Sequence, residues 1–455
     1  MSAVGKWLPS GLFGRGKTFA RGIHPDSHKD TAGLAIRRLP FAPEMIVPLS
    51  QHIGKPAIAL VQAGQEVVRG EPIGRADGFF SLPVHAPVTG VVRAVEPRMT
   101  ASGAMVTSVV IHTHPSSDQQ VLYRTPQDVA ALSGKALIQA IQDAGIAGMG
   151  GATFPAHVKL APPEGAVIDT FIANGAECEP YLTCDHRTML EQPNDVIAGV
   201  RLAMRACGAP RAIIGVEDNK PDAIRALRAA LRPEDAITVE AVVTKYPQGA
   251  EGTLIYALLG REIPIGQRTS AIGALGSNVM TLAYIGRLLH VGEGFIERVV
   301  TVTGPGVARP GNYLVPLGTP LRFLLEYTGA HGNEREIVLG GPMMGPAIAS
   351  LDVSITKGTS GVLVLGAAEI ATRSARSHPC IKCGECVQVC PKGLNPSMLG
   401  MLAAQRDYDT MVGHYHLFEC FDCGCCSYVC PSNIPLAQQF RIAKGVLRKR
   451  ATATP

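Results

Sequence analysis

Cysteines near the end of the chain fall into two runs with the same spacing. Each run reads C-x2-C-x2-C-x3-C-P, the spacing by which bacterial ferredoxins bind [4Fe–4S] clusters. Three closely spaced thiolates can hold three irons of one cluster, while the fourth, before proline, ligates the other cluster. The expected ligands of the first cluster are Cys380, Cys383, Cys386 and Cys430. Those of the second are Cys420, Cys423, Cys426 and Cys390.

Other roles for these cysteines fit the spacing less well. Zinc ribbons share C-x2-C pairs but not triplets closed by C-x3-C-P. Disulfides need an oxidising compartment, whereas the start of the chain has no apolar signal-peptide core, which predicts a cytosolic protein. Cys425 is an extra cysteine that could replace Cys426 as a ligand, but it breaks the two-residue spacing, which favours packing or tuning.

A glycine-rich turn from Gly148 to Gly151 is the second candidate for chemistry. Missing side chains let a phosphate or an isoalloxazine ring approach the backbone. The strict G-x-G-x-x-G fingerprint is not met, because Thr153 occupies the last glycine position. However, Glu177 and Glu179 follow the next predicted strand, where an acidic residue would bind ribose. Alone, the turn fits a structural role better than a binding role. Together with the acidic pair and the clusters, it predicts a dinucleotide site.

These two features together imply a bound flavin. A nicotinamide gives two electrons as a hydride, and a [4Fe–4S] cluster takes one electron at a time. A flavin can exchange electrons with both. We therefore expect FMN between NAD(H) and the two clusters.

Composition limits the partners. The 455 residues are 46% hydrophobic and 17% charged, enough for several cores, and only 5% aromatic, which argues against nucleic-acid binding. The net charge of +5 is concentrated at the ends, from Lys6 to Arg38 and from Arg441 to Arg450. These ends favour a membrane surface or an acidic partner, with simple solvation equally weighted. The uncharged stretch from Thr269 to Gly286 is interrupted by polar residues and glycine, so it does not predict a membrane span.

The elements that must position these residues predict a multidomain α/β and α+β protein. Residues 1–30 form an irregular basic arm. Residues 31–120 show short strands and turn glycines, as in the barrel-sandwich hybrid fold of lipoyl carriers. No lysine lies between Lys55 and Lys135, so a scaffold role replaces the carrier role. Residues 121–295 alternate helices and strands, which predicts a Rossmann-like parallel sheet.

The rest of the chain predicts two domains of other kinds. Residues 296–366 fit a β-grasp layout, with Thr319 as the cap of a helix over 320–327. Residues 367–455 form a helical ferredoxin-like domain with two [4Fe–4S] clusters, in which Asn395 caps a helix between the cysteine runs. The basic tail residues, Lys444 among them, are expected on the outer side of the last helix.

A family resemblance rests on three segments. These are residues 148–159, residues 174–181 and the two cysteine runs, and they resemble the C subunit of the Rnf electron-transport complex. The arm and the barrel match that subunit as well, so the resemblance covers nearly the whole chain. The central part is similar to the NADH- and FMN-binding subunit of respiratory complex I.

The resemblance implies a specific role. Rnf is an ion-translocating membrane complex that moves electrons between ferredoxin and NAD. Its C subunit is peripheral, on the cytoplasmic face of the bacterial inner membrane, beside membrane subunits and the iron–sulfur B subunit. The chain would thus be an NADH–ferredoxin oxidoreductase (translocase) subunit that reaches ferredoxin indirectly. The implied FMN and NADH residues are Gly148, Gly150, Gly151, Phe154, Lys159, Asn174, Glu177, Glu179, Tyr246, Glu251 and Asn278.

Two of these residues have specific implied roles, and three positions depart from the complex I pattern. Lys159 would hold phosphate or ribose oxygens, and Phe154 would stack on the nicotinamide or the adenine. Met149, Ala176 and Ala250 replace an arginine, an aspartate and a glutamate.

Two alternatives remain open from the sequence. One is a cobalamin reductase of the RnfC-like type, against which the barrel argues. The other is a non-catalytic iron–sulfur relay or scaffold, which predicts no flavin.

Overall fold

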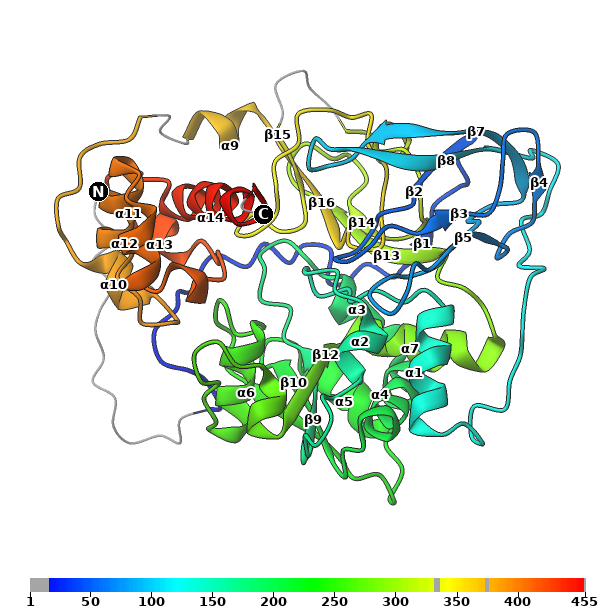
Figure 1. Cartoon of the computed structure of the whole chain (residues 1–455), viewed down its shortest axis with the longest axis horizontal. Helices are drawn as coiled ribbons and strands as arrows, with labels where there is room; N and C mark the ends of the chain where they lie inside the picture. The colour runs from blue at the N-terminus through cyan, green and yellow to red at the C-terminus, as the bar shows by residue number, and fades with distance from the viewer. Residues whose placement is uncertain (1–15, 331–335, 373–375, 454–455) are drawn as a thin grey trace.

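The computed structural model describes residues 16–330, 336–372 and 376–453 (Figure 1). Lys6 and Arg15 of the predicted basic arm lie outside the described residues. Four β-sheets and a helical C-terminal part make up the described chain. In Figure 1 the cysteine-bearing helices (orange to red) and the barrel (blue to cyan) lie at opposite ends of the molecule.

The central sheet is parallel, as the alternation of helices and strands predicted. Its strand order is β11-β10-β9-β12, so the chain extends the sheet to one side of β9 and then returns to the other side with β12. The strands are β9 (Thr170–Gly175), β10 (Ala212–Glu217), β11 (Ile237–Val242) and β12 (Ala274–Asn278). The side chains of β9, β10 and β12 are largely buried because helices cover both faces of the sheet.

One face of this sheet carries a large apolar core and the other a smaller one. Helices α4 and α7 pack on the first face, and α6 on the second. The helices of this domain are α1 (Gly134–Asp143), α2 (Ala156–Leu160), α3 (Cys184–Glu191), α4 (Pro193–Cys207), α5 (Pro221–Ala229), α6 (Glu251–Leu259) and α7 (Val279–Val291). The 3-10 turn Thr269–Ile272 precedes β12.

Helix α7 occupies part of the uncharged stretch noted in the sequence. It packs closely on α4 because both helices place glycine at the contact. A Cβ on Gly199 would lie 1.8 Å from the carbonyl oxygen of Leu282, and one on Gly286 would lie 2.1 Å from that of Asp195. Within the described ranges, no helix combines the length and the apolar character needed to cross a membrane.

The barrel consists of two small sheets that face each other across an apolar core. One has the order β2-β8-β7-β4 and contains β2 (Glu44–Pro48), β8 (Met105–Thr113), β7 (Gly90–Met99) and β4 (Glu66–Val67). The other has the order β3-β5-β6 and contains β3 (Ile58–Ala59), β5 (Pro72–Arg75) and β6 (Val84–His85).

The fourth sheet has five strands and lies between the barrel and the helical part (Figure 1). It contains β1 (Arg37–Arg38), β14 (Gly311–Pro316), β13 (Glu297–Thr303), β16 (Gly361–Leu365) and β15 (Glu336–Leu339), in that order, with helix α8 (Leu321–Thr328). Two expectations need correction. Strand β1 comes from the segment assigned to the barrel but pairs with β14. The cap of α8 is Pro320, because the Thr319 hydroxyl donates to the Pro316 carbonyl instead.

The C-terminal part is helical, as predicted. It contains α9 (Ala367–Thr372), α10 (Glu385–Val389), α11 (Pro396–Gln405), α12 (Tyr408–Gly413), the 3-10 turn Leu417–Glu419, α13 (Cys425–Tyr428) and α14 (Leu436–Ala453). The Asn395 side chain accepts from Met398 N at 3.1 Å, which confirms the predicted cap of α11. Leu399, Leu436 and Phe440 form its apolar core.

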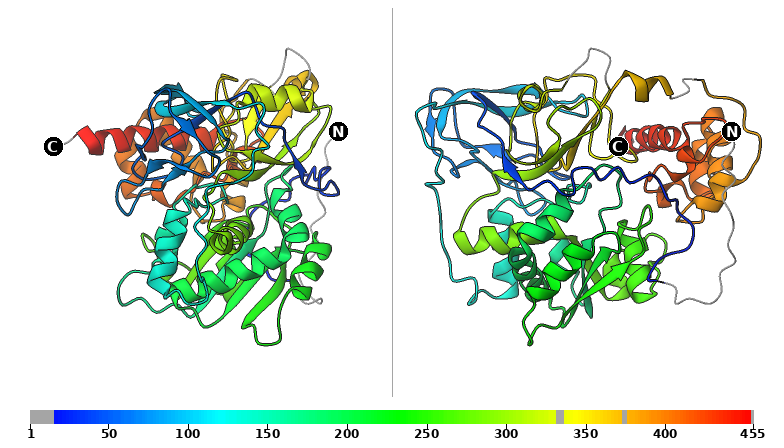
Figure 2. Two further views of the ribbon diagram at one scale, coloured as in Figure 1. Left: turned by 90° about the vertical axis from the view of Figure 1, so that its right-hand side faces the viewer. Right: turned by 180° about the vertical axis from the view of Figure 1, so that it is seen from behind.

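The described part of the arm has no helix or strand, as predicted, and it is bound to the body of the molecule. Lys17 forms a β-bridge with Val242, the last residue of β11, and Ile23 forms one with Tyr246. The Gly22 amide donates to the Val389 carbonyl at 3.1 Å. In the view from behind in Figure 2, this dark blue segment runs along the central domain and passes below the cysteine-bearing helices.

Candidate functional site

The carboxyl ends of β9 and β12 form the centre of the candidate nucleotide site. Asn174 and Asn278 end these two strands and are paired in register. The strand order changes direction between β9 and β12, and parallel sheets bind ligands at such switch points. Two polar side chains thus lie side by side where the fold favours a ligand.

The glycine loop passes directly over this position. A Cβ on Gly150 would lie 3.1 Å from the Asn278 Cβ, and the Met149 amide donates to the Thr281 hydroxyl at 2.9 Å. Gly151 has φ +108°, and a Cβ there would meet no atom of the described chain within 4 Å. The loop therefore offers exposed, side-chain-free backbone above the strand ends, as a flat ring or phosphate requires.

Met149 faces away from this surface. Its side chain is buried in the core on the α4 and α7 face of the sheet. The residue that departs from the complex I arginine therefore contributes apolar packing, and the loop keeps its conformation without a charged side chain.

Lys159 and Glu251 supply the charges next to the loop. Their side chains form an ion pair of 3.1 Å between α2 and the first turn of α6. Asn174 joins the same region, because its amide donates to the Gly249 carbonyl at 2.7 Å. The structure thus brings Lys159, Asn174 and Glu251 together with Gly150 and Asn278.

A buried acidic group lies just below this site, and sequence reasoning missed one of its members. The Glu177 carboxylate accepts from the backbone amides of Asp185 (2.8 Å) and His186 (3.2 Å) in the first turn of α3. Asp185 in turn accepts from the Asn278 side chain at 2.6 Å. Burial, and then the neighbouring Glu177 charge, raise the pKa of Asp185 to about 7.

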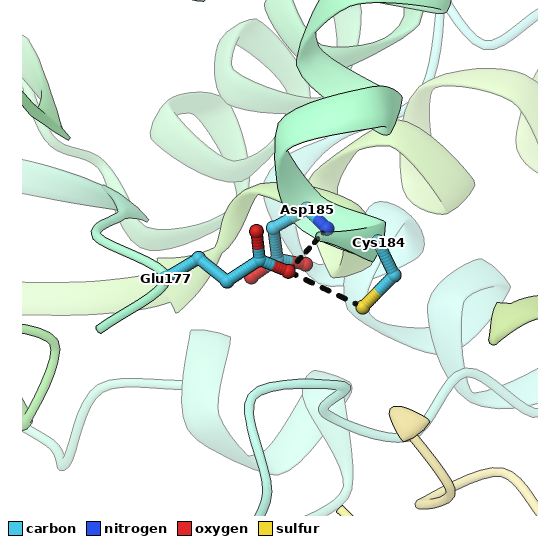
Figure 3. A group of neighbouring side chains, drawn as sticks. All are labelled: Glu177, Cys184 and Asp185. Carbon is cyan, nitrogen blue, oxygen red and sulfur yellow. Dashed lines mark hydrogen bonds between the residues drawn. The ribbon is translucent and has the colours of Figure 1, made fainter. Parts of the chain in front are cut away.

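Figure 3 shows Glu177, Asp185 and Cys184 converging. Their ligand atoms lie within 4.8 Å of one another, close enough for a metal ion. Both carboxylates, however, already accept hydrogen bonds from backbone or amide donors. We therefore assign the group to the support of Asn278. The sequence signal for Asp185 was an acidic residue in the first turn of a helix, which usually only stabilises the helix end.

Three predicted site residues lie against neighbouring domains. The Glu179 carboxylate accepts from the amides of Met343 (3.1 Å) and Met344 (2.9 Å), which a nucleotide at Glu179 would have to replace. The buried Tyr246 hydroxyl donates to the Cys423 carbonyl at 2.7 Å. The Phe154 ring lies 6.5 Å from the ring of Phe80 in the barrel. As nucleotide contacts, these three residues remain predictions.

The eight motif cysteines fall into the two crossed sets. Cys390 lines a cavity together with Cys420, Cys423 and Cys426. We call these four the inner set. The outer set comprises Cys380, Cys383, Cys386 and Cys430: burial raises the pKa of the Cys386 thiol, and the other three thiols raise it further. Cys425 also lines the inner cavity, so packing beside the inner set is compatible with the structure.

The two sets differ in exposure. Cys390, Cys423 and Cys426 of the inner set are each 8% exposed, whereas Cys380 and Cys383 of the outer set are exposed. Cys423 belongs to an apolar cluster with Ile23 and Tyr246 of the body. The inner set therefore faces the nucleotide-binding domain and the outer set faces solvent.

One basic residue of the tail contradicts its predicted position. Lys444 is 4% exposed, and its ammonium group donates to the Cys420 carbonyl and to the Asp422 carboxylate. Helix α14 therefore also carries a positive charge on the side that packs against the cysteine-bearing segment, where Asp422 is its ion-pair partner.

Family models match four consecutive segments of the chain. They describe an RnfC barrel sandwich hybrid domain (residues 17–116), a Nuo51 FMN-binding domain (141–287), an SLBB domain (299–347) and a 4Fe-4S dicluster domain (379–434). The FMN-binding match contains the glycine loop, both asparagines and the Lys159–Glu251 pair. The dicluster match contains both cysteine runs, so the family models support FMN and two [4Fe–4S] clusters as cofactors.

Similar curated proteins cover most of the chain. The C subunit of a proton-translocating ferredoxin:NAD(+) oxidoreductase complex from Clostridium ljungdahlii is 40% identical, over 89% of this chain and 88% of its own length. The C subunit of the Na(+)-translocating complex from Acetobacterium woodii is 41% identical, over 86% of this chain and 88% of its own. The C subunit of an ion-translocating oxidoreductase complex from Edwardsiella ictaluri is 41% identical, but the match spans only 54% of that longer protein.

A solved structure shares the fold at low identity. It is an NAD+-reducing [NiFe]-hydrogenase in the H2-reduced state, with a TM-score of 0.50 and 19% identity, covering 73% of this chain and 69% of the other. This likeness concerns the fold alone.

Proposed function

The chain belongs to the family of C subunits of ion-translocating ferredoxin:NAD(+) oxidoreductase complexes, and on this premise we propose that it exchanges electrons between NAD(H) and the other subunits. The observation that carries the proposal is the contact between the two sites. Tyr246, in the FMN-binding domain, donates a hydrogen bond to the Cys423 backbone of the inner set. The nucleotide-binding and cluster-binding parts are thus packed directly against each other.

The residues at the strand ends fit FMN. The backbone of Gly150 and Gly151 would lie against the flavin, since no side chain covers it. Lys159 would hold the phosphate, positioned by Glu251. Asn278 would be oriented by Asp185 and Asn174 by Gly249. When bound, FMN supplies the conversion between two-electron nicotinamide chemistry and one-electron cluster chemistry.

From the difference in exposure between the inner and outer cysteine sets we propose an order in which electrons pass through the two clusters. The inner set is the neighbour of the nucleotide-binding domain, and the outer set is accessible to another protein. Electrons would therefore pass between NAD(H), FMN, the inner cluster, the outer cluster and a partner subunit. Ferredoxin would be reached through the partners, which we propose are the iron–sulfur B subunit and the membrane subunits, on the cytoplasmic face of the membrane.

An anaerobic absorption spectrum of the purified chain, before and after addition of NADH, tests this proposal. We expect flavin bands that bleach together with the cluster absorption. Cluster absorption without flavin and without a response to NADH, even after FMN is added, would instead support the relay or scaffold role. The buried Met149 is the observation that favours that second candidate, because it offers no charge to a flavin.

A further inference from the structure

The two cysteine runs begin with loops of the same backbone geometry. Lys382 in the first run and Asp422 in the second occupy the same position, two residues after the first cysteine, with φ angles of +57° and +59°. Each donates its amide to the sulfur of that cysteine, Cys380 or Cys420, at 3.4 Å. Hydrogen bonds to sulfur, nearby charge and solvent exposure set the reduction potential of a cluster. Since this hydrogen bond is the same in both loops, charge and exposure distinguish them.

The side chains at this shared position carry opposite charges. Lys382 is exposed to solvent, which screens its charge. The Asp422 carboxylate lies against its own loop instead, with its Oδ1 atom 3.5 Å from the Cys420 sulfur. Reduction adds one negative charge to a cluster, so a carboxylate this close to a thiolate ligand disfavours the reduced form. Alone, Asp422 would therefore lower the reduction potential of the inner cluster.

A buried cation neutralises this carboxylate. Lys444 on α14 is 4% exposed, and its ammonium group donates to the same Asp422 Oδ1 atom at 2.7 Å. A second hydrogen bond, to the Cys420 carbonyl, fixes the ammonium group beside the ligand loop. Arg441, one turn earlier on the helix, donates to the Asp422 carbonyl at 3.3 Å and holds the same loop. Because Lys444 is buried, water and salt screen its charge much less than that of Lys382.

We propose that Lys444 sets the reduction potential of the inner cluster, by neutralising Asp422 and stabilising the electron that the cluster takes up. Lys444 acts through Asp422 and the Cys420 backbone, so it is a positioning residue of the electron path. Its effect on the potential requires only that the inner set holds a cluster. Its consequence for the reaction rests on the proposed function: the inner set is the neighbour of the nucleotide-binding domain, and a lower potential there would hold electrons back on the NAD(H) side.

A redox titration with mediators, followed by electron paramagnetic resonance, tests the proposal on the chain with both clusters. Dithionite supplies the electrons, so the result does not depend on NADH. Lys444→Met should lower one of the two midpoint potentials, with about a tenfold loss in the ratio of reduced to oxidised cluster, or about 59 mV for one electron. Asp422→Asn should raise the same midpoint potential by a similar amount. Lys444→Arg should retain it, and the double variant Lys444→Met with Asp422→Asn should restore it.

Lys382→Met is the matched control, because it removes an exposed charge from the same position of the other loop. It should change the ratio of reduced to oxidised cluster less than about twofold for either cluster. Iron analysis accompanies each variant. If Lys444→Met loses iron, Asp422→Asn decides the outcome, because it removes a charge and keeps the donor to the Cys420 carbonyl.

An unchanged midpoint potential in Asp422→Asn, or equal shifts of both midpoint potentials, would overturn the inference. So would a shift in Lys382→Met as large as that in Asp422→Asn. A wild-type chain that does not respond to NADH, while Asp422→Asn still raises one midpoint potential, would overturn the proposed function and leave this inference standing.

Discussion

Replacing Cys390 distinguishes crossed from uncrossed cluster ligation. Cys390 closes the first cysteine run in the sequence, but its side chain lines the cavity of the inner set with Cys420, Cys423 and Cys426. In an uncrossed arrangement it would instead serve the outer cluster. Cys390→Ser and Cys430→Ser are therefore a matched pair, because the two arrangements predict opposite losses.

The expected loss of iron in each variant follows from the number of clusters that the inner and outer sets hold. Two [4Fe–4S] clusters contain about eight irons, so either variant should retain about four. The cluster left in Cys390→Ser would be the outer one, which is separated from the nucleotide-binding domain by the inner site. NADH should then bleach the flavin but leave this cluster oxidised, although dithionite still reduces it. In Cys430→Ser the remaining inner cluster should still be reduced by NADH.

Iron and sulfide analysis counts the clusters that remain in each variant. Electron paramagnetic resonance after anaerobic addition of NADH or dithionite then shows which reductant reduces the remaining cluster. Cys390→Ala serves as a control, since a serine oxygen can replace a thiolate as an iron ligand. The crossed assignment is refuted if Cys390→Ser keeps an NADH-reducible cluster while Cys430→Ser loses it. Reduction of the outer cluster by NADH at the wild-type rate in Cys390→Ala would refute the proposed order of the clusters.

Three further predictions concern stability and the flavin site. Burial raises the pKa of Glu179 to about 7, so the folded state binds more protons than the unfolded state between pH 4.5 and 7. Glu179 should therefore contribute a fall in stability of at most about 3 kcal/mol as the pH rises across this window. Glu179→Gln should reduce the slope in urea unfolding and leave the part due to Asp185, whose pKa is also raised to about 7. An unchanged slope would contradict this assignment. Lys29→Met leaves three carbonyls, those of Glu177, Glu179 and Leu182, without their ammonium donor, and should cost about 3–5 kcal/mol in thermal unfolding. Lys55 is exposed and serves as the control: Lys55→Met should change stability by less than about 0.5 kcal/mol. If Lys29→Met and Lys55→Met changed stability equally, the structural role assigned to Lys29 would be wrong. Gly151→Trp should lower FMN content and NADH-driven reduction without loss of iron. Unchanged flavin content would show that the flavin does not bind at the glycine loop.

Local patterns predicted a large part of the fold. Strands β9 and β10 are apolar runs between helices, so the parallel pairing of the central sheet follows from the alternation of helices and strands in the sequence. The cap of α11 depends on a hydrogen bond between Asn395 and Met398, only three residues later in the sequence. The crossed cysteine sets follow from the spacing within each run. All these features depend on neighbours in the sequence or on one repeated pattern.

Features that depend on how domains meet could not be predicted. Tyr246 meets Cys423 and Glu179 meets Met343 only because separate domains pack together, 177 and 164 residues apart in the sequence. Strand β1 has two residues, too few for a periodic pattern. Asp185 has the sequence environment of any helix start, and its role depends on Asn278, 93 residues later.

The N-terminal arm links the maturation of the protein to its last-made residues. Arg21 donates to the carbonyl of Cys390, 369 residues further along the chain, and Gly22 pairs with Val389. During synthesis the arm emerges first, so Arg21 and Gly22 cannot make these contacts until the cysteine-bearing part has been made, and contacts of such sequence separation form late. Lys17, Ile23 and Lys29 are held by the central domain, so only the stretch around Arg21 and Gly22 depends on the inner set around Cys390. The stretch around Arg21 should therefore be cut more readily by proteases in cluster-free chains than after the inner cluster is inserted, which makes the beginning of the chain a reporter of cofactor loading at its end.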